Sequence, residues 1–201
     1  MRLVLASNNA KKLVELQALF APLGLDLVTQ GSLGIGEAEE PHGTFVENAL
    51  EKARHAARAA GGAAIADDSG LCVDALGGAP GVLSARYATL FGQPKSDEDN
   101  NRVLLEKLLP HPDRRGRFVC ALVAVRSAED PEPLIAFGRW DGEVLQAPKG
   151  EGGFGYDPLL WIPSLSASVA ELPAAEKNRV SHRAIASRQM LGLMQEVWRL
   201  G

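Results

Sequence analysis

The stretch that decides the fold is Ala64-Ile65-Ala66-Asp67-Asp68-Ser69-Gly70-Leu71. Its first part is small and apolar, so residues 63–66 are predicted to form a buried strand. Two carboxylates, a hydroxyl and a glycine follow, which predicts a polar turn at the end of that strand. Adjacent carboxylates are costly to bury unless a cation lies beside them. The stretch is therefore either an ordinary polar turn or a place where a hard divalent cation carries a phosphate substrate.

The chain as a whole has the size and composition of a globular protein. It has 201 residues and a net charge of −4, so we expect a single domain, residues 1–201. The negative charge and the lack of a long basic run disfavour a nucleic-acid partner. No apolar segment is long enough to span a bilayer, so no membrane association is expected. Cys72 and Cys120 lie far apart in apolar runs, which favours reduced thiols in a cytoplasmic protein.

The N-terminal residues predict a strand, a polar turn and a helix. Residues 2–6 read as the strand, and Leu13, Leu16 and Phe20 share one face of the helix that follows. Backbone N–H groups at such a helix start, with the Asn9 amide and Lys11 or Lys12, can bind a phosphate. A plain N-cap explains the same polar residues equally well.

The remaining elements predict an α/β fold. Thr44 and Glu47 form a capping box that opens an alanine-rich helix ending at Gly61. The other expected helices run from 97 to 109 and from a Ser181 N-cap to 200. The other expected strands cover 25–28, 71–73, 117–125 and 134–144. Because strands and helices do not alternate regularly, the sheet is expected to be mixed rather than wholly parallel.

Two late stretches carry residues suited to a ligand. Residues 150–158 place Phe154 and Tyr156 among four glycines, and either ring offers a flat face for a nucleobase. A glycine-rich hairpin loop is the alternative. His182 and Arg183 would lie in the first turn of the last helix, which is the unfavourable end for cations. That placement is understandable if they serve an anionic or carbonyl-rich ligand.

Five motifs, in this order, resemble the inosine triphosphate pyrophosphatase family, whose bacterial members are called dITP/XTP pyrophosphatases. They are Ser7-Asn8-Asn9-Ala10-Lys11-Lys12, Thr44-Phe45-Val46-Glu47-Asn48-Ala49, the stretch 66–71, Gly152-Gly153-Phe154-Gly155-Tyr156-Asp157-Pro158 and Ser181-His182-Arg183. The resemblance implies a long mixed sheet flanked by helices, two lobes with a nucleotide cleft between them, and a homodimer. It also implies Mg²⁺-dependent hydrolysis of ITP, dITP and XTP to the monophosphate and pyrophosphate, which cleanses the nucleotide pool.

The resemblance further implies roles for matching residues. Glu40 and Asp68 would bind Mg²⁺, and Glu40 is chosen from an acidic loop by its distance from Thr44. Family members often have glycine at the position of Asn8, so Asn8 is expected to adopt a conformation that glycine takes freely. The substrate-binding residues would be Ser7, Asn8, Asn9, Ala10, Lys11, Lys12, Ser69, Phe154, Gly155, Tyr156, Asp157, Lys177, His182 and Arg183.

The expected catalytic residues are Asp68, Asp67 and Lys12. Neighbouring side chains on an extended chain point to opposite faces, so both aspartates should not bind one metal. We assign the metal and the proton-accepting role to Asp68 and an orienting role to Asp67. Lys12 and Lys177 would stabilise charge on the leaving pyrophosphate. Water would be the nucleophile, because no Ser–His or Cys–His pairing is visible.

Two other functions are considered. The Maf-type pyrophosphatases of modified pyrimidine nucleotides also begin with a strand and a serine-rich phosphate loop, but the motifs at 154–157 and 181–183 favour the purine family. A non-catalytic nucleotide sensor could dispense with a water-activating base, so the carboxylates at 40, 67 and 68 argue against it. Within the purine family, His182 and Arg183 would donate hydrogen bonds to the 6-carbonyl of the base.

Overall fold

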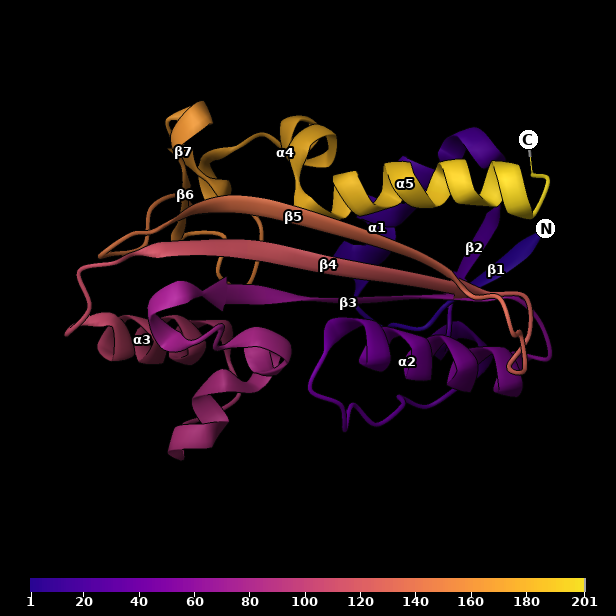
Figure 1. Cartoon of the computed structure of the whole chain (residues 1–201), viewed down its shortest axis with the longest axis horizontal. Coiled ribbons are helices and arrows are strands. Elements are labelled where there is room, and N and C mark those ends of the chain that lie inside the picture. The colour runs from indigo at the N-terminus through magenta and orange to yellow at the C-terminus, as the bar shows by residue number, and fades with distance from the viewer. Residues whose placement is uncertain (201) are drawn as a thin grey trace. The chain divides into compact units, whose positions relative to one another are not determined.

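The structure is a computed structural model that describes residues 1–200 (Figure 1). The α-helices are α1 (Ala10–Phe20), α2 (Phe45–Ala60), α3 (Asp97–Leu108), α4 (Ala174–Val180) and α5 (His182–Val197). The strands are β1 (Arg2–Leu5), β2 (Asp26–Thr29), β3 (Ala64–Val73), β4 (Arg115–Val125), β5 (Leu134–Val144), β6 (Leu160–Ile162) and β7 (Ala167–Ser168). Short 3₁₀ helices connect them. Helix α4 was not predicted from the sequence.

The strands form one mixed sheet in the order β2-β1-β3-β4-β5-β6-β7. Strand β1 pairs in parallel with β2 and with β3, whereas β6 pairs antiparallel with β5 and with β7. The mixed pairing confirms the predicted α/β class. Parallel pairing of β1 with β3 brings the end of β1, which leads into the polar loop 7–12, beside the apolar half of β3.

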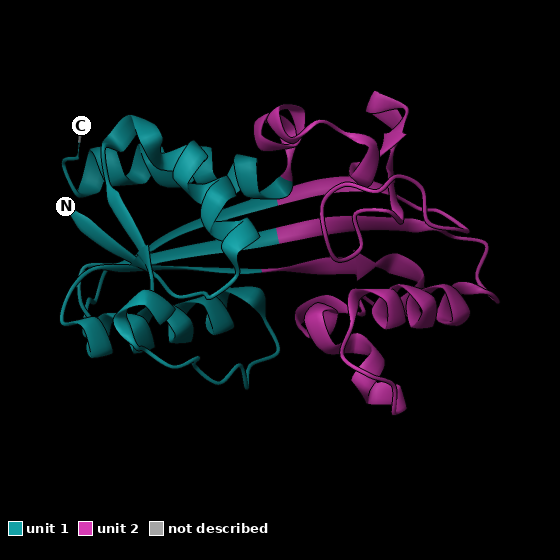
Figure 2. Cartoon of the chain, turned by 180° about the vertical axis from the view of Figure 1, so that it is seen from behind, with its two compact units in different colours: residues 1–68, 120–138, 182–201 teal, residues 69–119, 139–181 magenta. Residues whose placement is uncertain are grey.

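The chain divides into two compact units, which are coloured separately in Figure 2. Unit 1 comprises residues 1–68, 120–138 and the chain from residue 182 onward, and unit 2 comprises residues 69–119 and 139–181. Each of the strands β3, β4 and β5 contributes residues to both units. The single domain expected from the sequence and the nucleotide cleft between two lobes stay predictions.

Unit 1 has an apolar cluster on each face of its strands. Helices α1 and α5 cover one face, where Leu16 of α1 and Met190 of α5 are fully buried (Figure 1). Helix α2 covers the other face through its predicted alanine stripe, which includes Ala49, Ala53 and Ala56. Because alanine side chains are short, α2 can lie close to the sheet, and its polar residues come near the strand surface.

Unit 2 has its own apolar core. Leu104 and Leu108 of α3 pack with Leu71 of β3, Leu160 of β6 and the ring of Tyr156. Both cysteines of the chain are free thiols. No helix within residues 1–200 is long and apolar enough to cross a membrane.

Strand β3 differs from the prediction. A polar turn was expected at Asp67-Asp68-Ser69-Gly70, but the strand continues unbroken from Ala64 to Val73. Asp67 and Asp68 are 1% and 6% exposed, so two carboxylates are buried in the middle of a strand. A turn is unnecessary there because cations from other elements compensate both charges, as described below.

Helix ends follow the sequence more closely. The Thr44 hydroxyl accepts a hydrogen bond from the Glu47 N–H and donates one to the Glu47 carboxylate, so Thr44 is the predicted N-cap of α2. Gly61 ends that helix with a φ of +65°, a conformation that favours glycine. Ser96 caps α3 through the N–H of Asp99.

Candidate active site

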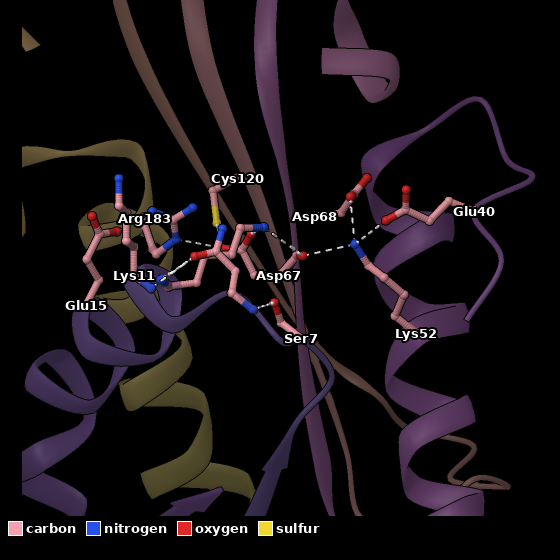
Figure 3. A network of polar contacts seen from close by, with 11 residues as sticks. Ser7, Lys11, Glu15, Glu40, Lys52, Asp67, Asp68, Cys120 and Arg183 are labelled. Atoms are coloured by element: carbon pink, nitrogen blue, oxygen red, sulfur yellow. Dashed lines mark hydrogen bonds and ion pairs between the residues drawn. The ribbon is translucent and has the colours of Figure 1, made fainter. Parts of the chain in front are cut away.

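The pleat of β3 sends the two adjacent aspartates in opposite directions, as expected for an extended chain (Figure 3). Asp67 points toward α1 and α5, and Asp68 points toward α2 and the loop that carries Glu40. Each carboxylate therefore has its own set of partners. All of these partners belong to unit 1.

Asp67 is the centre of a buried charge network. Its Oδ1 accepts a hydrogen bond from the Lys12 ammonium at 2.5 Å, and its Oδ2 accepts one from the Arg183 Nε at 2.7 Å. The Cys120 thiol donates to the same Oδ2 at 3.4 Å. Burial alone would raise the pKa of Asp67, but the charges of Arg183 and Lys12 hold it well below its usual range. Asp67 is therefore an anion at neutral pH.

Arg183 is held by two carboxylates. Besides the contact with Asp67, its Nη1 donates a short hydrogen bond to the Glu15 carboxylate of α1. The Arg183 side chain is only 2% exposed. Burial lowers the pKa of Arg183, but the charges of Asp67 and Glu15 outweigh that effect and raise it. The sequence placed Arg183 against a ligand, whereas the structure places these two nitrogens on carboxylates.

Asp68 belongs to a second group, which the Lys52 ammonium joins together. Lys52 Nζ donates to Asp68 Oδ1 and to Glu40 Oε1, both at 2.8 Å, and to the Asp67 carbonyl oxygen at 3.0 Å. Burial raises the pKa of Asp68, and Lys52 offsets only part of this effect. Burial lowers the pKa of Lys52, but Asp68 and Glu40 raise it by more. The pKa of Asp67 is thus lowered and that of Asp68 is raised.

The second group suits a hard cation. Asp68 Oδ2 is buried and has no hydrogen-bond partner among residues 1–200. Glu40 adds a carboxylate that is still 27% exposed. No cluster of three or more Asp, Glu, His or Cys with metal-binding geometry occurs in the described part of the chain. Two carboxylates are nonetheless sufficient for Mg²⁺, which usually takes one or two together with water and substrate phosphate.

The loop before α1 is a side-chain-capped helix start. Asn9 is the N-cap, and its Oδ1 accepts from the backbone N–H groups of Lys11 and Lys12 at 3.0 and 3.2 Å. Ser7 Oγ accepts from the Asn9 N–H at 3.1 Å. The plain N-cap interpretation is therefore correct for Asn9, and the N–H groups of Lys11 and Lys12 already have a partner. Phosphate contact by Asn9 or by these groups would require the amide to turn.

Asn8 departs from the expectation drawn from the family. Among residues 1–200 only Ser166 and Arg199 are non-glycine residues with positive φ. Asn8 therefore does not adopt the conformation for which glycine is preferred. Its amide instead donates to Glu37 of the acidic loop at 3.4 Å.

Helix α5 lies against β5 through a glycine. A Cβ added at Gly138 would lie 1.8 Å from the His182 carbonyl oxygen and 2.9 Å from the Ala186 nitrogen. Only glycine allows so close an approach of helix backbone to strand. His182, whose carbonyl oxygen makes this contact, and Arg183 are the first two residues of α5. They are 5% and 2% exposed.

Unit 2 holds a separate group of predicted site residues. The Lys177 ammonium donates to Asp157 Oδ2 at 2.7 Å and lies 4.6 Å from the centre of the Phe154 ring. The Phe154 N–H donates to the same carboxylate oxygen at 2.9 Å. A Cβ at Gly153 would lie 1.9 Å from that oxygen. A cavity of about 630 Å³ is bordered by α3 and by this loop, including Phe154.

The two aromatic residues of this loop differ in environment. Tyr156 is 4% exposed, packs in the core of unit 2 and donates its hydroxyl proton to the Ser84 carbonyl at 2.9 Å. It does not offer the flat face that the sequence suggested, so Phe154 is the aromatic that remains for this role. Ser69, on β3, is half-buried.

Comparison with known proteins identifies the family. The model of the Ham1 family matches residues 3–193. This chain belongs to the Ham1 family. The dITP/XTP pyrophosphatases of Methylibium petroleiphilum and Ralstonia nicotianae are 67% and 63% identical, covering 98% and 94% of this chain and 99% and 94% of their own lengths. The assignment confirms the resemblance found in the sequence.

Solved Ham1 structures have the same fold. A HAM1 protein from Coxiella burnetii is 42% identical with a TM-score of 0.91, over 98% of this chain and all of that chain. The Staphylococcus aureus Ham1 protein is 37% identical with a TM-score of 0.86, over 98% of this chain and 99% of that chain.

Sequence reasoning missed several residues of this Ham1 site: Glu15, Lys52, Cys120 and Gly138. Glu15 follows Lys12 by three positions, a helical spacing that places both on one face and could have indicated a pair. Lys52 and Cys120 carried no comparable signal, because the carboxylate partners of Lys52 lie 12 and 16 positions away and that of Cys120 lies 53 positions away. The tight contact at Gly138 depends on the path of α5 and cannot be read from local sequence.

Proposed function

We propose that this chain is a nucleoside-triphosphate pyrophosphatase that hydrolyses ITP, dITP and XTP to the monophosphate and pyrophosphate. The observation that carries the proposal is the full-length similarity to dITP/XTP pyrophosphatases, supported by the partly buried contacts of Lys12 with Asp67 and of Lys52 with Asp68 in unit 1. The family match favours purine substrates over the Maf-type alternative. Removal of such nucleotides would cleanse the nucleotide pool.

The acid–base roles follow from the environments of the two aspartates. A general base must exchange its proton near the working pH, so a carboxylate with a raised pKa is suited to the task. Asp68 has that property, and its buried Oδ2 has no hydrogen-bond partner among residues 1–200, so we assign this oxygen to the attacking water. Asp67 is held as an anion and is suited to orienting Lys12. We therefore assign proton acceptance to Asp68 alone.

Magnesium is the metal we propose, held by Glu40 and Asp68. When bound, it would neutralise phosphate oxygens and lower the barrier to attack by water. Lys12 would stabilise charge on the leaving pyrophosphate from its position on Asp67. Ser7, Asn8, Asn9, Ala10 and Lys11 would line the triphosphate. Lys52 would then exchange part of its contact with the carboxylates for substrate phosphate.

We propose that Phe154 stacks on the purine and that Lys177 and Asp157 fix the orientation of its ring. Gly155 and Ser69 would contribute backbone and hydroxyl contacts, and His182 would donate to the 6-carbonyl. We also propose a homodimer in the cytoplasm. Ile135 and Phe137 of β5 are 45% and 43% exposed and offer apolar surface for such an interface. Sedimentation velocity would test the dimer.

The reaction is tested by product analysis. ITP, dITP, XTP and the canonical triphosphates are incubated with the protein and MgCl₂, and pyrophosphate is measured separately from orthophosphate. We expect IMP and pyrophosphate from ITP, with canonical nucleotides turned over far more slowly. IDP and orthophosphate as first products would show that the bond cut is not the one proposed.

The base assignment is tested by Asp68→Asn. This change keeps the side-chain shape and removes the proton acceptor, so turnover of ITP should fall by at least about 10²-fold. Asp141→Asn is the matched control, because Asp141 is 67% exposed and pairs with exposed Arg139. Near-normal turnover in a folded Asp68→Asn protein would move the base elsewhere.

A further inference from the structure

Four buried or half-buried charges of unit 1 form one continuous chain of contacts (Figure 3). It runs from Lys12 to Asp67 Oδ1, from Asp67 Oδ2 to Arg183 Nε, and from Arg183 Nη1 to Glu15. Side-chain exposure along the chain is 17%, 0%, 2% and 14%. Two cations and two anions make the group electrically neutral, which is the condition for keeping such charges away from water.

The two ends of this series of contacts lie on one helix, α1. Lys12 and Glu15 lie one turn apart on α1, Asp67 comes from β3 and Arg183 from the first turn of α5. Both ends of the network are thus anchored in α1, at its N-terminal half. The network ties together the three elements that carry the predicted phosphate loop, the two aspartates and the His182-Arg183 pair.

Glu15 affects which partners the two carboxylate oxygens of Asp67 have. With Glu15 present, Arg183 takes one oxygen of Asp67 and leaves the other to Lys12. Without the Glu15 charge, Asp67 would carry a larger share of the compensation of the buried guanidinium. A guanidinium facing a single carboxylate favours two parallel hydrogen bonds. The Asp67 carboxylate would then turn toward Arg183, and the Lys12 ammonium would lose its hydrogen bond to Oδ1 and keep its longer contact with the Asp67 carbonyl oxygen, at 3.5 Å.

We infer that Glu15 is a positioning residue that, through Arg183 and Asp67, holds the Lys12 ammonium in place for the triphosphate. This inference rests on the proposed function for the identity of the substrate. Arg183 is a positioning residue in the same network, since two of its nitrogens contact carboxylates. Glu15 itself touches neither substrate nor metal in this scheme.

The test is a double-mutant cycle between Glu15→Gln and Lys12→Met. If Glu15 acts through Lys12, Glu15→Gln lowers kcat/KM for ITP by about tenfold or more when Lys12 is present, and by less than about twofold in the Lys12→Met background. A role in stability alone would give the same factor in both backgrounds. Glu132→Gln is the control, because Glu132 is an exposed carboxylate of unit 1 that pairs with exposed Arg126.

A second readout does not depend on turnover. Binding of inorganic tripolyphosphate in the presence of MgCl₂ is measured by calorimetry for the same set of proteins. Glu15→Gln should weaken this binding severalfold with Lys12 present and leave it unchanged without Lys12. Urea unfolding checks that each variant is folded. If Glu15→Gln does not fold, Glu15→Asp, which keeps the charge and shortens its reach, takes its place in the cycle.

The outcomes separate the two proposals. Coupling in tripolyphosphate binding without hydrolysis of any nucleotide would overturn the proposed function and support the positioning role of Glu15. Hydrolysis of ITP with equal effects of Glu15→Gln in both Lys12 backgrounds would overturn the positioning role and leave the function intact. Unchanged binding and turnover in a folded Glu15→Gln protein would also overturn the positioning role.

Discussion

Lys52 offers a direct test of how the Ham1 site keeps two carboxylates close together. Its ammonium donates a hydrogen bond to Asp68 Oδ1 and another to Glu40 Oε1. In Lys52→Met the aliphatic part of the side chain is kept and the charge is removed. The variant therefore leaves two acids facing each other without the cation between them, while core packing changes little.

The size of the effect follows from exposure. The side chain of Glu40 is 27% exposed and can recover much of its hydration, whereas the side chain of Asp68 is 9% exposed and cannot. A hydrogen bond to a charged group contributes about 1.5–3 kcal/mol, and leaving a buried partner unsatisfied costs a similar amount. We therefore expect Lys52→Met to lower the free energy of unfolding by about 2–3 kcal/mol, most of it through Asp68.

Magnesium should oppose this loss. Removing one positive charge makes the Glu40–Asp68 pair a stronger cation site, so Mg²⁺ should stabilise the variant more than the wild type. At about 10 mM MgCl₂ and a dissociation constant of about 1 mM, the stabilisation is about 1.4 kcal/mol. Urea unfolding followed by circular dichroism, with and without MgCl₂, measures both effects.

The control is Lys95→Met, the same chemical change at an exposed lysine. It should change the free energy of unfolding by less than about 0.5 kcal/mol, with no response to Mg²⁺ beyond that of the wild type. If Lys52→Met unfolds like the wild type in both buffers, Lys52 does not compensate the carboxylates. The assignment of Glu40 and Asp68 to one site would then lose its basis.

Two further predictions concern unit 1. Gly138→Ala forces a backbone shift at His182, so it should lower the free energy of unfolding by about 1–3 kcal/mol. Gly62→Ala, at a glycine with open space around it, is the control, and urea unfolding measures both variants. Equal effects would contradict the close packing of α5. The Arg126 guanidinium holds the pKa of Asp130 at about 2, below its unfolded value, so this pair stabilises the fold above about pH 4 and loses that effect as the pH falls toward 2. Arg126→Ala should therefore flatten the acid limb of the stability curve while costing less than about 1 kcal/mol at pH 7; an unchanged acid limb would exclude the pair as its source.

Local signals were sufficient for much of the fold. The cap at Thr44 and the stop at Gly61 depend on neighbouring residues, and the structure confirms them. The alternation of side chains on β3 was also predicted correctly, because it is a property of extended backbone. The short helix α4 has no side-chain N-cap, so its start had no signal in the sequence from which it could be predicted.

The turn expected at Asp67 was wrong for a physical reason. A turn was expected at Asp67 because two carboxylates in a strand are unfavourable without cations. Lys12, Lys52 and Arg183 supply those cations from positions between 15 and 116 residues away. The same separations concealed the carboxylate partners of Arg183, and its predicted contact with the substrate stays a prediction. The cations that compensate Asp67 and Asp68, and the carboxylates that hold Arg183, come from residues far away in the sequence. A short stretch of sequence therefore could not reveal them.

The division of labour between the two aspartates is itself a consequence of the strand. Had the chain turned at Asp67, both carboxylates could have approached the same cations and would have resembled each other chemically. Because β3 continues, its pleat exposes Asp67 to two cations and Asp68 to one lysine shared with Glu40. The carboxylate of Asp67 is thereby kept anionic and that of Asp68 has a raised pKa, although both are aspartates and are adjacent in the sequence. A continuous strand is thus sufficient to shift the pKa values of two adjacent aspartates in opposite directions, which is the basis of the separate roles we propose for them.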